Sequence, residues 1–107
     1  HDTFGLGHLR RCRAIAHALT GALPGTHVQI ISGSRDSLRF SFSASVDCTP
    51  LPGIRKQPDG SYAAAQGTDM ALPELLALRR RLILDIAREY QPHLLLVDKE
   101  PWGLCGE

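Results

Sequence analysis

Apolar residues recur every three or four positions after His8, which is the spacing of one face of an α-helix. The residues on this face are Leu9, Cys12, Ala16 and Leu19. Arg10, Arg13 and His17 form the opposite, polar stripe. We therefore predict a helix that starts near His8 and ends at Gly21, with His17 in solvent.

The same periodicity predicts a second, longer helix from Leu72 to Tyr90. Its apolar face consists of Leu75, Leu78, Leu82, Ile86 and Tyr90. Pro73 fits the first turn, where no backbone N–H is needed, and Gln91-Pro92 stops the helix. The run Arg79-Arg80-Arg81 interrupts the pattern. We interpret it as a solvated flank rather than an anion-binding patch, because charge runs on helices usually face water.

Short apolar runs predict the strands. Val28 to Ile31, which follows the Pro24-Gly25 turn, and Leu94 to Val97 have the apolar character of parallel strands that are covered on both faces. Strands that alternate with helices indicate an α/β fold. We expect an incomplete Rossmann-like parallel sheet flanked by helices.

The middle of the chain carries weaker signals. A short helix around Asp36 to Phe40 and a strand near Val46 to Leu51 are predicted after a serine-rich stretch. Pro58-Asp59-Gly60, between Ile54 and Tyr62, is a turn signal and predicts a small hairpin.

Composition narrows the class of protein. The chain has 107 residues, of which 43% are apolar and 21% charged, and a formal charge of +1, which fits at most one globular domain and gives no electrostatic case for nucleic acid. Cys12, Cys48 and Cys105 are too widely spaced for a disulfide framework or a zinc site, and they indicate a reducing, cytoplasmic compartment. The longest apolar run, Leu94 to Val97, is far shorter than the roughly 20 residues of a membrane span.

The sequence at both ends of the chain is typical of positions inside a longer protein. The chain starts without a methionine, at a turn that should follow a first strand, and it stops at Gly106-Glu107 in a predicted loop. We expect residues 1–107 to be a partial Rossmann-like domain that lacks its first, central strand. The helices that begin near His8 and Leu72 would then lose part of the sheet that they cover.

The opening sequence His1-Asp2-Thr3-Phe4-Gly5-Leu6-Gly7-His8 leads a glycine turn straight into the first predicted helix. Glycines let the backbone approach a ligand, and a helix start offers N–H groups and the positive end of the dipole. The turn therefore predicts a phosphate or diphosphate site. The same dipole disfavours a cation on His8, which leaves a neutral imidazole able to accept a proton. The alternative is a tight connection without function.

A nicotinamide or flavin cofactor is not expected. Arg10 stands where the dinucleotide fingerprint needs its third glycine, and the strand that ends at Ile31-Ser32-Gly33 lacks the carboxylate that would bind ribose. The residues indicate no metal requirement and no other cofactor.

A second candidate segment, Asp98-Lys99-Glu100, follows the predicted strand from Leu94 to Val97. Ligands of open α/β sheets bind beyond the carboxyl ends of the strands, so this segment and the glycine turn should face the same crevice. The alternative is an ordinary exposed loop with a local ion pair.

These motifs resemble the amino-terminal part of predicted bacterial glycosyltransferases related to MurG. The segments that carry the resemblance are Gly5-Leu6-Gly7-His8-Leu9-Arg10-Arg11, Ala14-Ile15-Ala16-His17-Ala18-Leu19, Ile31-Ser32-Gly33-Ser34, Leu51-Pro52-Gly53, Leu78-Arg79-Arg80 and Leu96-Val97-Asp98-Lys99-Glu100-Pro101. The most specific of them are the Gly-x-Gly-His-x-x-Arg turn and the Val-Asp-Lys-Glu-Pro segment. The resemblance covers essentially the whole chain. It implies a GT-B fold, two Rossmann-like halves around a cleft, with residues 1–107 in the acceptor-side half and the nucleotide-sugar-binding half outside them.

The resemblance also implies an activity: transfer of a sugar from a nucleotide diphosphate-sugar donor to an acceptor of unknown identity. His8 matches the histidine at the head of the helix and would be the catalytic base. The residues expected to contact phosphate or substrate are Thr3, Gly5, Leu6, Gly7, Arg11, Asp98, Lys99 and Glu100. MurG itself has a second glycine-rich loop where this chain has Asp98 to Gly103, which argues against a lipid-diphosphate acceptor.

Two alternatives stay open. A UDP-sugar hydrolase of the pseudaminic acid pathway has a similar turn, in which the histidine is thought to activate water, so the turn alone does not separate transfer from hydrolysis. A non-catalytic sugar-phosphate binding module would keep the glycine turn without depending on His8. The expected partners are the nucleotide sugar and its acceptor, with no nucleic acid and no membrane span; peripheral contact with a membrane is left open.

Overall fold

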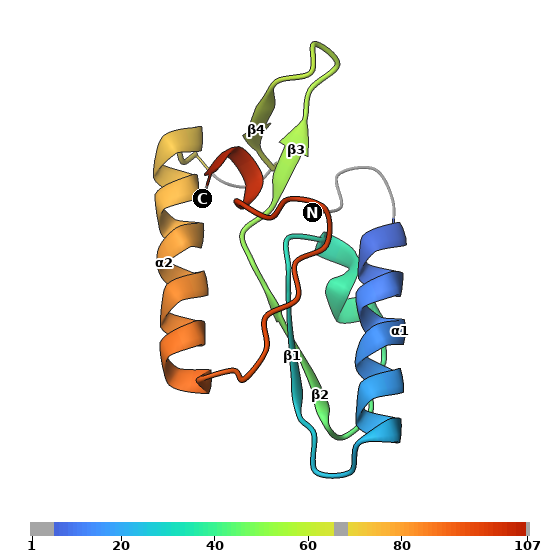
Figure 1. The fold of residues 1–107 in the computed structure, drawn as a ribbon. Coiled ribbons are helices and arrows are strands. Elements are labelled where there is room, and N and C mark those ends of the chain that lie inside the picture. Colours follow the sequence, from blue (N-terminus) through green and yellow to red (C-terminus); the bar gives the residue numbers. More distant parts are fainter. Residues whose placement is uncertain (1–5, 66–68, 107) are drawn as a thin grey trace. The chain divides into compact units, whose positions relative to one another are not determined.

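The computed structural model describes residues 6–65 and 69–106, and the chain divides into two compact units, His1–Leu51 and Pro52–Glu107. The elements, in chain order, are α1 (Gly7–Ala22), β1 (Val28–Ser32), the 3₁₀ helix η1 (Arg35–Arg39), β2 (Val46–Pro50), β3 (Ile54–Lys56), β4 (Tyr62–Ala64), α2 (Leu72–Tyr90) and the 3₁₀ helix η2 (Leu104–Gly106) (Figure 1). The structure is small and mixed α/β, as the sequence predicted.

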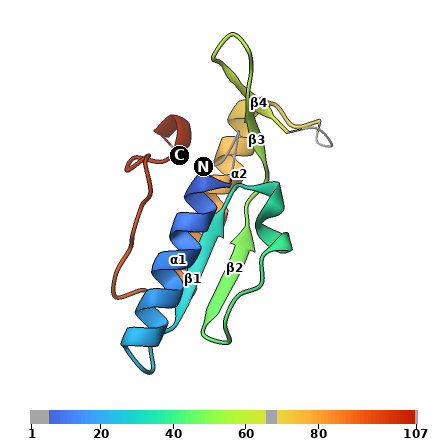
Figure 2. The ribbon, with the colours of Figure 1, turned by 90° about the vertical axis from the view of Figure 1, so that its right-hand side faces the viewer.

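In the first unit, α1 packs against a two-stranded parallel sheet. β1 and β2 pair with Val28 opposite Val46 and Ser32 opposite Pro50, and α1 runs along both strands (Figure 2). The buried apolar core consists of Leu9, Ala16, Ile30 and Val46. The predicted helix and both strands are confirmed here, although α1 continues one residue past Gly21.

The polar stripe of α1 is less exposed than its sequence suggested. Arg13 donates from Nε to the Ser41 carbonyl at 2.9 Å, and its guanidinium lies 5.7 Å from the Phe40 ring centroid. His17 is half-buried, and its Nε2 accepts the Ser43 N–H at 3.4 Å. His17 thus lies at the surface but is not fully solvated, because the segment between β1 and β2 contacts this stripe, a tertiary contact that helical periodicity does not encode.

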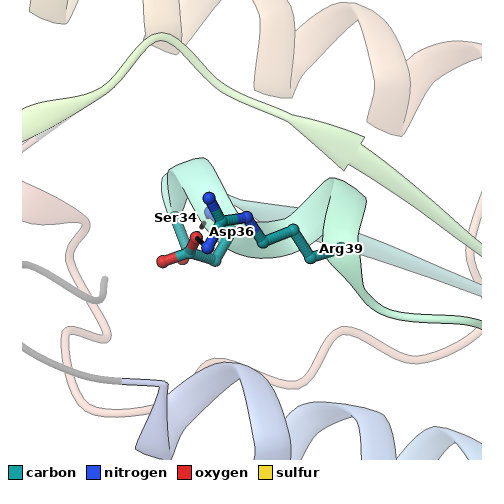
Figure 3. A network of polar contacts seen from close by, with 3 residues as sticks. All are labelled: Ser34, Asp36 and Arg39. Carbon is teal, nitrogen blue, oxygen red and sulfur yellow. Dashed lines mark hydrogen bonds and ion pairs between the residues drawn. The ribbon is translucent and has the colours of Figure 1, made fainter.

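The connection from β1 to β2 is a short 3₁₀ helix with its own polar cap. The Ser34 hydroxyl accepts the Asp36 N–H at 3.3 Å, and the Asp36 carboxylate pairs with Arg39 at 3.1 Å (Figure 3). Serine at the N-cap satisfies a backbone donor that the helix cannot satisfy itself. The predicted short helix is confirmed.

In the second unit, β3 and β4 form the predicted antiparallel hairpin, with Ile54 opposite Ala64. In the turn, the Asp59 carboxylate accepts the Ser61 N–H at 2.9 Å and the Ser61 hydroxyl at 2.6 Å. These two bonds stabilise the ionised form and lower the pKa of Asp59. Gly60 has φ +88°, a backbone conformation that favours glycine.

The long helix α2 has the predicted bounds, and its amino-terminal half packs on the hairpin. Leu75 is buried with Ile54 and Leu104 in the second core. At its carboxyl end, Gln91 adopts the left-handed conformation with φ 49°, and its N–H bonds the Ala87 carbonyl at 3.0 Å. The packed face of α2 follows the predicted apolar periodicity, but the surface that it covers is the hairpin.

One arginine of the run on α2 is buried. Arg79 has only 3% of its surface exposed, and its Nη1 donates to the Pro52 carbonyl at 2.6 Å. Arg80 and Arg81 are exposed. The interpretation of the run as a solvated flank is thus wrong for Arg79, because this position faces the inner side of the helix, four residues after the buried Leu75.

The predicted strand from Leu94 to Val97 is not present as a strand. These four residues are 69%, 73%, 61% and 52% exposed, and none of the strands in the described residues pairs with them. A parallel strand exists only through hydrogen bonds to a neighbouring strand, so an apolar run without one stays extended in solvent. The nearby Trp102 is 87% exposed.

Candidate functional site

The N-cap residue at the start of α1 makes no side-chain cap among the described residues. Leu6 occupies the N-cap position with φ −92° and ψ 11°, and it offers no side-chain cap. The first helical bond joins the Arg10 N–H to the Leu6 carbonyl at 2.8 Å. An uncapped N-terminus directs backbone N–H groups and the positive end of the dipole outward, which favours a bound anion.

The charges on α1 reinforce this preference. The helix contains three arginines and two histidines and no carboxylate, and none of its first-turn residues is acidic. Arg10 and Arg11 are exposed near the start, and His8 is half-buried beside them. Carboxylates are common in the first turn of a helix because they offset the dipole, so their absence leaves the positive potential for a ligand.

The backbone reason for a glycine at position 7 needs correction. We predicted a tight turn there, but Gly7 is the first residue of α1, and a Cβ added to it would meet nothing within 4 Å. Its conformation is therefore open to other residues. Because glycine has no side chain, the backbone at position 7 is exposed at the helix start.

The described residues include part of the predicted turn. Leu6, Gly7, His8 and Arg11 lie together at the head of α1. Thr3 and Gly5 lie outside the described residues. Phosphate contacts by those two residues therefore stay predictions.

The second candidate segment is a turn in the second unit. Asp98 and Glu100 are half-buried, and Lys99 is exposed with φ 83°. The Glu100 carbonyl accepts the Gly103 N–H at 2.9 Å, which closes the turn around Pro101 and Trp102. A lysine in the left-handed region is uncommon, and such backbone strain is often found at ligand sites.

The two candidate segments belong to different units of the chain. Leu6 to Arg11 belong to the first unit, and Asp98 to Glu100 belong to the second. The shared crevice thus stays a prediction, and each segment is considered on its own.

Within the part of the chain that the structure describes, no group of three or more histidine, cysteine or acidic residues could hold a metal ion. Among the same residues, no helix is both long and apolar enough to cross a membrane.

Sequence reasoning missed a polar residue in the first core. Ser37, in η1, is fully buried, and its hydroxyl lies against the Cys48 thiol. Cys48, on β2, lies close enough to Ser37 for that hydroxyl to favour the thiolate, but burial outweighs this effect and raises the pKa of the thiol. The only signal in the sequence was the density of serines between the two strands.

Comparison with known proteins gives no assignment of class. No protein-family model, no curated protein and no solved structure matches this chain. A functional proposal therefore depends on the residues and geometry described above.

Proposed function

We propose that this chain contributes the acceptor-side half of a GT-B glycosyltransferase related to MurG, which uses a nucleotide diphosphate-sugar donor. One observation carries the proposal: the start of α1 combines an uncapped N-terminus, the absence of acidic residues in the first turn, and exposed Arg10 and Arg11. A diphosphate is the biological anion that best fits a site of this kind, because it spreads negative charge over oxygens that backbone N–H groups and arginines can contact together.

His8 is the base in this proposal. It sits in the first turn of α1, where its ring can accept the proton of an acceptor hydroxyl as the bond to the sugar forms. General-base assistance of this type is worth on the order of 10²–10⁴ in rate. The rest of the acceleration would come from orienting the acceptor and stabilising the departing diphosphate.

The anion site can be tested on this chain directly. We expect uridine diphosphate and inorganic pyrophosphate to shift the backbone amide NMR signals of residues 6–10 in a saturable way. A carboxylate in Leu6→Asp would occupy the positive end of the dipole and weaken binding by about twofold to fivefold. Leu6→Asn has nearly the same shape without the charge, but it caps the same N–H groups, so we expect it to bind diphosphate more weakly than the parent and more tightly than Leu6→Asp. Equal affinity of the two variants would contradict the anion site.

The reaction can be tested on the protein as its natural gene encodes it. Incubation with nucleotide sugars, with and without candidate acceptors, distinguishes a glycoside product, free sugar or neither, which correspond to a transferase, a hydrolase and a binding module. We expect a glycoside. We also expect His8→Ala and His8→Gln to lower kcat by at least about 10²-fold with little change in KM, because neither side chain accepts a proton. A near-parental kcat in His8→Gln would show that the imidazole is not the catalytic base.

A further inference from the structure

The outer edge of β1 has no strand neighbour among the described residues. The Val28 N–H donates to the Ser45 carbonyl at 2.9 Å, so the backbone groups of Val28 point toward β2. Backbone groups alternate in direction from one residue of a strand to the next. The N–H and C=O groups of Gln29 and Ile31 therefore point away from β2, to the unpaired edge.

The two edges of this parallel sheet differ in how they are protected. β2, whose other edge is also unpaired in the described part of the chain, carries the charge of Asp47 and ends at Pro50, which has no N–H. Charges and prolines oppose the addition of a further strand at a sheet edge. β1 has neither, because its five residues are Val-Gln-Ile-Ile-Ser. The edge of β1 is thus the one that can accept a strand.

α1 forms an apolar wall beside this edge. One flank of the helix is polar, and its Arg13 and His17 make hydrogen bonds to the segment that leads into β2. Ile15 and Leu19, one turn apart, lie on the opposite flank by helical spacing. Figure 2 shows α1 over the sheet beside β1, with η1 on the far side of β2, so the apolar flank lies on the side of the open edge. Ile15 is 42% exposed there.

The space beside β1 suits a single bare strand. A strand needs about 4.8 Å next to its neighbour, whereas a helix that packs on the same face needs about 10 Å. The β1 of a second copy, which carries its own α1, would bring the two helices into collision. The occupant is therefore an apolar strand without a helix over it.

The chain contains such a segment. Leu94 to Val97 is uncharged, its four side chains are 52–73% exposed, and no strand of the described residues pairs with it. Its length of four residues matches the five residues of β1. Since the run and β1 of one chain are not paired with each other, the run that fills the edge comes from another copy.

We propose that the Leu94–Val97 run of a second copy adds to the outer edge of β1 as a third strand. Its backbone hydrogen-bonds to Gln29 and Ile31, and its side chains pack on the Ile15 and Leu19 flank of α1. Reciprocal exchange makes this contact twice and closes a symmetric dimer. The interface does not depend on the glycosyltransferase proposal.

Amide hydrogen exchange followed by NMR tests the contact at each backbone group. We expect the Gln29 and Ile31 N–H groups to exchange at least about tenfold more slowly at concentrations where sedimentation velocity shows a dimer than in the dilute monomer. The Val28 N–H, which is already bonded to the Ser45 carbonyl, is the internal control and should change far less.

Two matched variants separate this contact from general apolar adhesion. Leu95→Lys should weaken the dimer by at least about tenfold and abolish the slowed exchange, because the leucine is no longer buried in the contact. Leu38→Lys changes a leucine of similar exposure, 75% against 73%, outside the proposed interface. We expect it to dimerise as the parent does.

A peptide with the sequence of residues 92–99 isolates the strand addition. Added to the Leu95→Lys chain, it should slow the exchange of the Gln29 and Ile31 N–H groups, and the same peptide with Leu95→Lys should not. Three results would each overturn the proposal: a dimer in which both groups exchange as in the monomer, slow exchange of both groups in the dilute monomer, or a parent chain that never associates.

Discussion

At the scale of single residues, position on a helix separates side chains that are identical in the sequence. Arg79, Arg80 and Arg81 are consecutive, yet only Arg79 is buried and hydrogen-bonded to the Pro52 carbonyl. A buried guanidinium needs partners, because the desolvation of its charge is otherwise uncompensated. Arg79 therefore joins α2 to the chain that leads into β3, while its two neighbours face water.

We expect Arg79→Ala to lower the free energy of unfolding by about 1.5–3 kcal/mol, the usual range for a hydrogen bond from a charged group. The measurement is urea unfolding followed by circular dichroism at the helix band. Arg80→Ala is the matched control, and we expect a change within about 0.5 kcal/mol because its side chain is exposed. Equal losses in the two variants would show that the Pro52 contact contributes nothing.

The Cys48 thiol makes stability depend on pH at the alkaline end. Burial raises its pKa above the ordinary 9.0. The unfolded chain, with the lower pKa, releases this proton first as the pH rises, so the contribution of Cys48 is complete below pH 9.0 and is lost through the interval up to the raised value. We expect the melting temperature to fall over this interval in the parent and to fall less in Cys48→Ala. Parallel curves for the two proteins would contradict the assignment.

At the same scale, the sequence predicted which residues lie at the start of α1, but it did not predict the backbone conformation of Gly7. The helix period and the uncapped start placed Leu6, Gly7, His8 and Arg11 together, because these are local features. Gly7 itself belongs to α1, and the rest of the predicted glycine turn, including Gly5, lies outside the described residues. The contact between the buried Ser37 and Cys48 could not be predicted, because it forms only where η1 meets β2.

At the scale of elements, local patterns predicted the helices well and the strands only where a partner was available. The bounds of α2 follow from the spacing of its leucines and from the Gln91-Pro92 stop. Val28 to Ile31 became a strand because β2 pairs with it, whereas the equally apolar Leu94 to Val97 did not. A helix satisfies its own backbone and a strand does not, which is why sequence predicts the first more securely.

The end of α2 offers a test at this scale. Gln91 caps the helix in the left-handed conformation, which costs a residue with a Cβ about 1–2 kcal/mol. We expect Gln91→Gly to raise the free energy of unfolding by roughly 0.5–1 kcal/mol, because the relieved strain exceeds the extra chain entropy that glycine loses. Gln91→Ala keeps the strain and should give no gain. Thermal unfolding of both variants checks this, and an equal gain in the two would show that the strain is absent.

At the scale of the whole molecule, two small cores replace one large core. The residues that are fully buried and apolar in the two clusters are Leu9, Ala16, Ile30 and Val46 in the first unit, and Ile54, Leu75 and Leu104 in the second. Units of about 50 residues bury a smaller fraction of their surface on folding than larger domains do, so their stability is marginal. The run from Leu94 to Val97 adds exposed apolar surface to a molecule whose buried apolar cores are small.

We expect this run to promote self-association, as large exposed apolar patches do. Leu95→Lys places a charge at its most exposed position, 73% in solvent, so it should reduce association without changing the free energy of unfolding by more than about 0.5 kcal/mol. Sedimentation velocity over a range of concentrations measures the first effect, and thermal unfolding the second. If the parent chain stays monomeric at all concentrations, the prediction that this run promotes self-association is wrong.

The exposed turn at Trp102 determines what optical spectroscopy can report. This is the only tryptophan in the chain, and it is 87% exposed in the folded state. Its indole meets water before and after denaturation, so its emission will change little as the chain unfolds. The same property makes it a sensitive reporter of docking: any partner, substrate or second copy that covers this turn will transfer the indole from water into an apolar environment, and the emission will shift to the blue while the rest of the fold stays unchanged.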